Sequence, residues 1–217
     1  METVAQRQRE KIKRLLTLFI AFAPLYAYAQ TAAILKVEGD VTVKMPGVAN
    51  WEKARADMKL AGETRIKTGT GARCVLGFDE GLNKIVAFEG DTVAAITSVE
   101  PGEVSLTKGR AFTLIDTMQN TETFNVRTPT AAAGALGTGW LTDSHTGGTD
   151  LKCFDNAISV EGLDPSGNPT GEKDLEEGFG LEVADGGIIG DPSRLTEADY
   201  AQWNGFVSGV SKKGLEK

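Results

Sequence analysis

The stretch FNVRTPTAAAGALGTGWLT, residues 124–142, decides the fold of this chain more than any other segment. Apolar and polar residues alternate at its start, which predicts a strand that ends at Pro129, because proline has no N–H to donate to a ladder. Small residues follow over 131–135, where one backbone is expected to pass close to another. A second strand is expected to begin at Trp140. The stretch contains no nucleophile, metal ligand or phosphate-binding loop, which favours a binding or signalling module over an enzyme.

The first 29 residues have the pattern of a secretory signal. A basic segment precedes the apolar residues 15–23, Pro24 ends that run, and Ala27-Tyr28-Ala29 forms an A-x-A cleavage pattern. A membrane anchor needs about 20 apolar residues, and a nucleic-acid-binding arm would not be followed by such an apolar run. We therefore expect cleavage after residue 29, a periplasmic or secreted protein, and no membrane span after cleavage.

The rest of the chain is acidic. Residues 1–29 hold five of the 23 basic and two of the 30 acidic residues, so the remainder has a formal net charge of −10. Affinity for phosphate backbones comes from lysine and arginine, so we expect no nucleic-acid partner. The acidity is typical of a soluble exported protein.

Most of the chain after residue 29 has the sequence pattern of short β-strands. Glycine accounts for 26 of 217 residues, and turn residues separate short alternating runs every 8–12 residues. This predicts an all-β domain of short strands, rolled or solenoid-like, with a β-sandwich as the alternative. We expect the β domain to span residues 30–190. Separate strands are expected at 103–106 and 111–115, and a loop over 143–150.

The tail, residues 191–217, predicts one helix. Thr196 is a candidate N-cap with Asp199 at the third helical position, and Leu195 is placed to pack onto Tyr200. Apolar residues then recur at helical spacing from Trp203 onward. Either this helix presents its aromatic residues to a partner, or it folds back on the β domain, which we favour because glycines weaken it in isolation.

The two cysteines, Cys74 and Cys153, each lie in an alternating run. In an oxidising compartment a pair is more often bridged than free, so a disulfide between them is possible. Two small buried side chains that never meet are the alternative.

The strand and turn motifs together resemble the FecR domain of bacterial envelope proteins, over about residues 33–185. The resemblance is strongest where a Gly-Thr pair precedes a tryptophan. The matching motifs are Val37-Glu-Gly-Asp-Val-Thr-Val43, Leu60-x-Gly62-Glu63-x-x-Ile66-x-Thr68-Gly69-x-Gly71-Ala72, Leu76-x-Phe78-x-x-Gly81, Val104-x-Leu106-x-x-Gly109, Phe124-x-Val126-x-Thr128-Pro129 and Gly137-Thr138-x-Trp140. The resemblance implies an interaction or ligand-binding module.

The chain departs from the family pattern at named positions. Leu136 stands where the family usually has arginine before the Gly-Thr pair. A late glycine is replaced around Asn156, although asparagine tolerates positive φ in a turn. FecR-type regulators of iron transport also join a cytoplasmic anti-sigma segment and a membrane helix to this domain. The segment before residue 15 is too short for that, so the resemblance implies a stand-alone envelope version.

No residue pattern predicts catalysis, a cofactor or a metal site. The single histidine, His145, follows Asp143 and Ser144, and residues so close in sequence rarely hold the geometry of a catalytic triad. One histidine and two distant cysteines give no zinc site. Aspartates at four positions could contribute to calcium binding, but no calcium-loop spacing appears. These are Asp143, Asp150, Asp164 and Asp174.

Two functions remain open. The first is a non-catalytic module that recognises an envelope protein or a surface polymer through an exposed edge or loops. The second is a protein acting on carbohydrate or peptidoglycan through two carboxylates within about 10 Å in one concave site. A binding surface would be sought first at residues 128–139 and 143–148.

Overall fold

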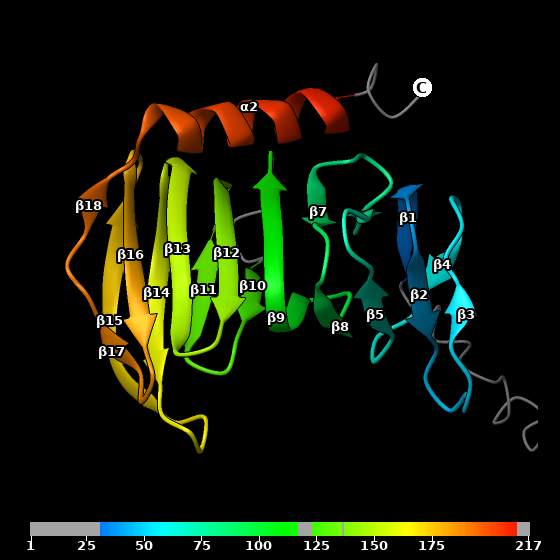
Figure 1. Cartoon of the computed structure of the whole chain (residues 1–217), viewed down its shortest axis with the longest axis horizontal. Coiled ribbons are helices and arrows are strands. Elements are labelled where there is room, and N and C mark those ends of the chain that lie inside the picture. The colour runs from blue at the N-terminus through cyan, green and yellow to red at the C-terminus, as the bar shows by residue number, and fades with distance from the viewer. Residues whose placement is uncertain (1–30, 117–122, 136, 212–217) are drawn as a thin grey trace, which may run out of the picture.

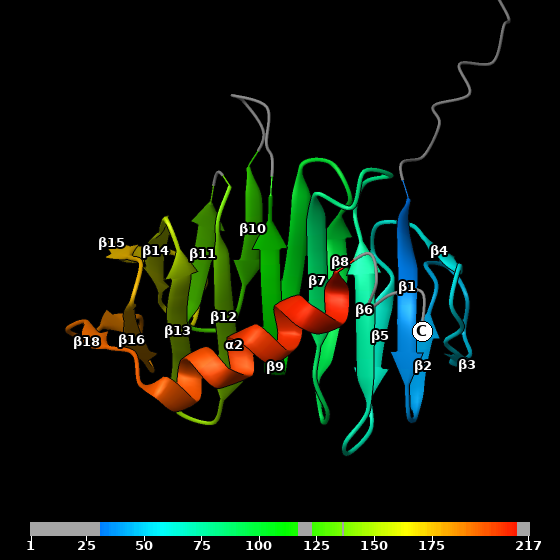
Figure 2. The same ribbon diagram turned by 90° about the horizontal axis from the view of Figure 1, so that it is seen from above.

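Eighteen strands and one helix form the part of the chain that this computed structural model describes, residues 31–116, 123–135 and 137–211. The expected signal sequence and Leu136 lie outside these residues. The strands make two stacked sheets, and helix α2 (Glu197–Val210) lies across one of them (Figures 1 and 2). The all-β class with one C-terminal helix is confirmed.

The two sheets share a single long strand, β9 (Gly102–Ile115). Sheet A contains, in spatial order, β4 (Lys59–Leu60), β1 (Ala32–Glu38), β6 (Arg73–Gly77), β7 (Lys84–Phe88), the second half of β9, β12 (Gly139–His145), β13 (Gly148–Asp155) and β16 (Phe179–Ala184), with β17 (Ile188–Ile189) and β18 (Ser193–Arg194) on β16.

Sheet B runs alongside in the same direction. It contains β3 (Glu52–Lys53), β2 (Val41–Lys44), β5 (Arg65–Thr68), β8 (Val93–Ser98), the first half of β9, β10 (Phe124–Arg127), β11 (Ala131–Ala135), β14 (Ala157–Leu163) and β15 (Pro169–Glu176).

Strand β9 leaves one sheet and enters the other at Gly109. Residues 103–108 pair with β8 in sheet B, and residues 111–115 pair with β7 in sheet A. Gly109 has φ +93°, and a Cβ there would lie 2.4 Å from the Thr92 hydroxyl, so only glycine fits. The two separate strands expected at 103–106 and 111–115 are therefore one bent strand.

The chain crosses repeatedly between the sheets, mostly as hairpins. Strands β10 and β11 pair in sheet B, β12 and β13 in sheet A, and β14 and β15 in sheet B again. Each pair adds to the growing end of the stack, which runs along the long axis of the molecule (Figure 2). The fold thus combines the predicted roll with the alternative sandwich: the chain winds back and forth between two sheets that face each other.

The main hydrophobic core fills the space between the sheets. It is built from alternate residues of strands in both layers, including Ile34, Ile66, Phe88 and Val126, all fully buried. Phe124 packs edge-on against Phe78, with 5.0 Å between ring centroids. The alternation in sheet B strands such as β5 and β10 follows from burial on one face only.

The middle of sheet A is buried on both faces, because α2 covers its outer side there. In β6 and β7 four consecutive residues are buried, a pattern expected for strands between two layers. The ring of Trp203 stacks on Phe154 at 4.8 Å, and that of Phe206 stacks on Phe112 at 5.1 Å. The expectation that the helix folds back on the β domain is confirmed.

The start of α2 forms the predicted capping box. Thr196 accepts from the Asp199 N–H, and the Asp199 carboxylate accepts from the Thr196 N–H at 2.8 Å. Lys152 on β13 reaches the same carboxylate at 2.6 Å. Burial alone would raise the pKa of Asp199, but hydrogen bonds from Lys152 and Thr196 outweigh it and bring the pKa to about 2.

Three threonines join the two sheets at one end of the core. Thr128 and Thr130, which flank Pro129 between β10 and β11, each lie within hydrogen-bonding distance of the Thr149 hydroxyl on β13, at 2.7 and 2.8 Å. All three are buried. The Thr128 hydroxyl also accepts from the Ala131 N–H, so the Thr-Pro motif fixes a turn as well as an inter-sheet contact.

Cys74 and Cys153 are both buried free thiols. Both lie in sheet A, and strands β7, β9 and β12 separate β6 from β13. Four strand spacings amount to about 19 Å, whereas a disulfide requires Cα atoms within about 7 Å. The disulfide that the sequence allowed is not formed. Burial raises the pKa of Cys74 to about 12, which keeps it as an unreactive thiol.

Two further segments differ from the sequence expectation. Residues 131–135 form a regular strand, β11, between β10 and β14. The loop expected over 143–150 is instead a tight hairpin, because β12 extends to His145 and β13 begins at Gly148. At the turn after β13, Asn156 has φ +55°, so this asparagine does adopt the positive φ that the sequence allowed for it.

Replacement of Gly139 tests how closely α2 packs on sheet A. A Cβ at Gly139 would lie 2.3 Å from the Trp203 ring, so Gly139→Ala should cost about 1–3 kcal/mol of unfolding free energy through overpacking. Gly205→Ala is the matched control, since nothing lies within 4 Å of its added methyl, and it should stabilise α2 by about 0.5–1 kcal/mol. Urea titration measures both; equal effects would contradict this packing.

The threonine contact between the sheets can be tested in the same way. Thr149→Val removes a hydroxyl shared by Thr128 and Thr130, and should cost about 1–3 kcal/mol. Thr113 is also fully buried, but its hydroxyl has no hydrogen-bond partner among the described residues. Thr113→Val should therefore be neutral or stabilising. Thermal unfolding that shows the two valine variants equally destabilised would contradict the assignment.

Candidate binding surface on sheet B

The outer face of sheet B is the candidate functional surface, because no described element covers it. Helix α2 lies on the opposite side of the molecule, over sheet A (Figure 2). We call the outer face of sheet B the open face. Its outward side chains include half-buried Thr42, Asn125 and Ser159, which mark a polar and solvent-accessible surface.

One row of side chains crosses the open face from strand to strand. Its members are directly opposite one another in the register of β2, β5, β8, β9, β10, β11, β14 and β15. The row consists of Lys44, Arg65, Ala95, Ser105, Arg127, Ala132, Glu161 and Glu172. It begins with two cations, continues through small residues and a third cation, Arg127, and ends with two carboxylates.

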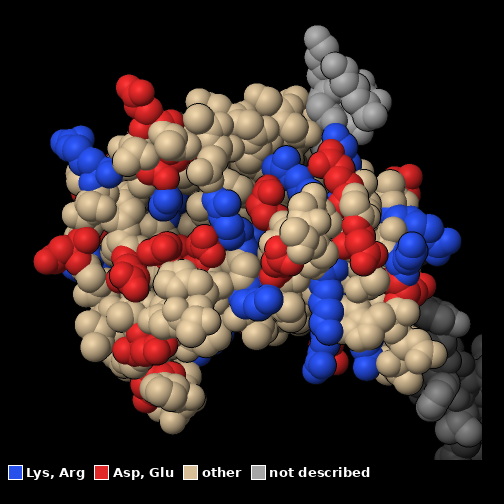
Figure 3. Space-filling view, viewed as in Figure 1, with Lys and Arg blue, Asp and Glu red and all other residues tan. Residues whose placement is uncertain are grey.

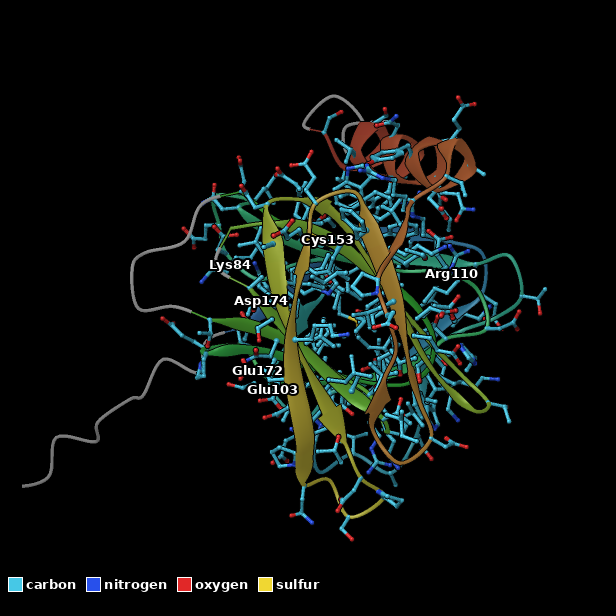
Figure 4. All side chains as sticks on the ribbon, turned by 90° about the vertical axis from the view of Figure 1, so that its left-hand side faces the viewer. Lys84, Glu103, Arg110, Cys153, Glu172 and Asp174 are labelled. Atoms are coloured by element: carbon cyan, nitrogen blue, oxygen red, sulfur yellow. The ribbon has the colours of Figure 1, made fainter. Side chains whose placement is uncertain are left out.

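The two ends of the open face therefore have opposite charge. Lys67 adds to the basic end on β5, and Asp174 adds to the acidic end on β15. Figure 4 shows Glu103, Glu172 and Asp174 on the side of the molecule away from α2. On the face seen in Figure 3, by contrast, both signs of charge are interspersed. Such a gradient favours oriented binding of a charged partner.

The first predicted segment, residues 128–139, contributes to the centre of this face. Ala132 and Gly134 of β11 point outward, whereas Thr128 and Thr130 are buried. The Asn125 side chain lies over Gly134, since a Cβ there would be 2.3 Å from the Asn125 side-chain oxygen. The segment thus supplies a flat, small-residue centre rather than chemically reactive groups.

The second predicted segment, residues 143–148, lies in sheet A instead. Asp143 faces Arg110 of β9 at 3.4 Å, and His145 faces Asp150 of β13 at 3.4 Å. Burial raises the pKa of Asp143, while the Arg110 charge opposes that rise. The structure therefore does not bring the two predicted segments into one site.

Carboxylates meet at two places among the described residues of this side of the molecule. Glu161 and Glu172 face each other across strands on the open face. Asp164 and Asp185 line a cavity of about 710 Å³ beside Arg127. Hydrogen bonds from Asn168 hold the pKa of Asp164 below its usual range, so Asp164 stays ionised and serves to fix the turn.

The described residues contain no group of three histidine, cysteine, aspartate or glutamate side chains that could hold a metal ion. Of the four aspartates considered for calcium, Asp143 and Asp150 are cross-strand neighbours, and Asp164 and Asp174 lie in different strands or turns. No described helix is both long and apolar enough to cross a membrane.

The described residues form a two-layer β domain with one covered and one open sheet. Within it, residues 53–159 match the family model described as FecR protein. The match extends from β3 to β14 and includes most of the open face. The chain therefore carries a FecR domain, and the resemblance drawn from its motifs is confirmed over these residues.

Solved structures support the same fold. Two crystal structures of a candidate anti-sigma factor from Parabacteroides distasonis ATCC 8503, at 1.65 and 2.50 Å resolution, each align with a TM-score of 0.51 and 17% identity. The alignments cover 64% of this chain and 64% and 63% of those chains. This chain thus spans less than two thirds of either. No curated protein matches it in sequence.

The sequence did not reveal the charged row, because its members lie on eight strands far apart in the chain. Alternation within β5 and β14 shows which side chains point outward, but only the strand register places Arg65 and Glu161 in one row. The one local signal for the basic end of this row was an excess of lysine and arginine at outward positions before residue 70.

His145 offers a direct check of the β12–β13 hairpin. Its pKa is raised above 6.5, first by a backbone hydrogen bond at Thr146 and further by Asp150. The pKa of His145 is higher in the folded chain than in the unfolded chain, so its protonation stabilises the hairpin. This stabilisation is complete at a pH below the unfolded pKa, and it is lost as the pH rises through the folded pKa. NMR titration should show the raised pKa, Asp150→Asn should lower it, and Asp164→Asn should leave it unchanged.

Proposed function

We propose that this chain is a non-catalytic FecR module that works outside the cytoplasm and binds another envelope component in a signalling system. The open face of sheet B is the observation that carries the proposal. A sheet face with a charge gradient and no covering element is suited to a partner of matching shape and charge, whereas the other sheet is already buried beneath α2.

A signalling role is supported at the level of the family. Residues 53–159 match the FecR protein family, and the solved structures of similar fold come from a candidate anti-sigma factor. The proposed location rests on the signal pattern of residues 1–29. A regulatory partner on the same side of the membrane would reach the open face directly.

A binding role also accounts for the arrangement of acidic residues better than glycoside hydrolysis does. The facing pair Glu161 and Glu172 does not line the cavity described above, and the Ser159 hydroxyl donates to Glu172 at 2.6 Å. Hydrolysis needs one protonated and one ionised carboxyl in a shared concave site. The hydrogen-bonded Asp164 is unsuited to the protonated role.

Export can be measured with alkaline phosphatase fused after residue 217, since this enzyme becomes active only outside the cytoplasm. We expect high activity from the full chain and little after removal of residues 15–23, the apolar part of the expected signal. Equal activity from both fusions, or none from either, would contradict the proposed location.

The binding surface can be mapped by a photo-crosslinking amino acid in living cells. Placed at Ala132, in the centre of the open face, it should yield a discrete adduct with a partner. Placed at Asn204, an exposed position of α2 on the opposite side, it should not. Adducts at both positions alike, or only at Asn204, would overturn the assignment of the open face.

A further inference from the structure

The basic end of the open face is hollowed into a groove of two adjoining cavities. Their volumes are about 540 and 520 Å³, and they share Lys44, Arg65 and Ala95. Cavities of a few hundred Å³ are the size that holds small ligands. Two such compartments on either side of Arg65 suit an extended ligand with repeating units better than a single compact one. We call them the basic groove.

The cations of the basic groove have no acidic partner. None of the ion pairs among the described residues involves Lys44, Arg65 or Lys67. Lys36, by contrast, is paired with Glu38 at 3.1 Å. Lys44 and Arg65 line both cavities, Lys67 lines one of them, and Glu63 lines the other. Three cations against one carboxylate leave an excess of positive charge at the groove, in a chain of net charge −7, and an anion would neutralise it.

An aromatic ring and hydroxyl groups complete the lining. The Trp51 ring is half-buried at the groove, and the Lys67 ammonium lies 4.4 Å from its centroid. Ser105 and Thr107 supply hydroxyls on β9. An indole offers a flat apolar surface with a polar edge, and a guanidinium can bind a carboxylate through two parallel hydrogen bonds. This combination matches a ring that carries hydroxyls and a carboxylate.

An acidic peptide is less suited to this place. Strand β5 is paired with β2 on one side and β8 on the other, and β8 is paired with β5 and β9. Their backbone groups are therefore already used, so a peptide cannot add to the sheet as a further strand. Recognition at the groove must come from side chains, which is the ordinary mode for saccharides.

We propose that the basic groove binds an acidic oligosaccharide, with its carboxylates at Arg65 and Lys67 and a sugar ring on Trp51. The inference deepens the proposed function, since it gives the chemistry of an envelope component that the open face would bind. The saccharide proposal can be wrong while the proposed function is right. Export and photo-crosslinking test the proposed function in cells, whereas saccharide binding is measured on purified protein.

Isothermal titration calorimetry of the purified full chain tests the proposal, with trigalacturonic acid as the acidic probe and maltotriose as its neutral counterpart. Trigalacturonic acid should bind and maltotriose should bind at least tenfold more weakly. Arg65→Gln and Trp51→Leu should each weaken trigalacturonate binding at least tenfold. Lys36→Gln, which removes an ion-paired lysine from β1, should leave it unchanged. Near-ultraviolet circular dichroism checks that every variant is folded.

Three outcomes would overturn the proposal. The first is absence of trigalacturonate binding to the folded wild-type chain. The second is equal affinity for hexaglutamate, which would mean that the groove senses charge alone. The third is dimerisation in analytical ultracentrifugation that Arg65→Gln abolishes, without saccharide binding. In that case the basic groove would bind the acidic end of the open face of a second copy, at Glu161 and Glu172.

Discussion

The structure depends on one strand that belongs to two sheets. Strand β9 pairs with β8 and β10 in its first half and with β7 and β12 in its second. The two layers are therefore joined by continuous backbone at their middle, and the hairpins on either side extend both layers outward from it. Gly109 makes this possible, because the bend brings the backbone against Thr92 with no room for a side chain.

The asymmetry between the two sheets follows from α2. Its aromatic residues bury part of the outer face of sheet A, so β6 and β7 are apolar on both sides, whereas sheet B keeps the alternation of a one-sided strand. That difference leaves one large polar face for recognition. The charge gradient across it is a property of the assembled sheet, since the two ends of the row come from strands as distant in the chain as β2 and β15.

Local patterns predicted much of this fold, and long-range geometry explains what they missed. The capping box at Thr196 and the alternating strands depend on near neighbours, so they were accessible from sequence. The alanines of β11 have low strand propensity and form a strand only because β10 and β14 flank them. The separation of Cys74 from Cys153, and the row that ends in Glu172, depend on strand order, which no local pattern encodes.

The three tryptophans lie in three separate environments: Trp51 in the basic groove, Trp140 in the inter-sheet core and Trp203 beneath α2. Their indoles differ in polarity of surroundings, and only that of Trp203 is stacked parallel on a phenylalanine, at an angle of 2°. The molecule thus carries three tryptophan fluorophores, one in the basic groove, one in the core between the sheets and one where the helix packs on sheet A. Emission from chains that retain a single tryptophan would distinguish ligand entry, loss of the core and detachment of the helix without any added label.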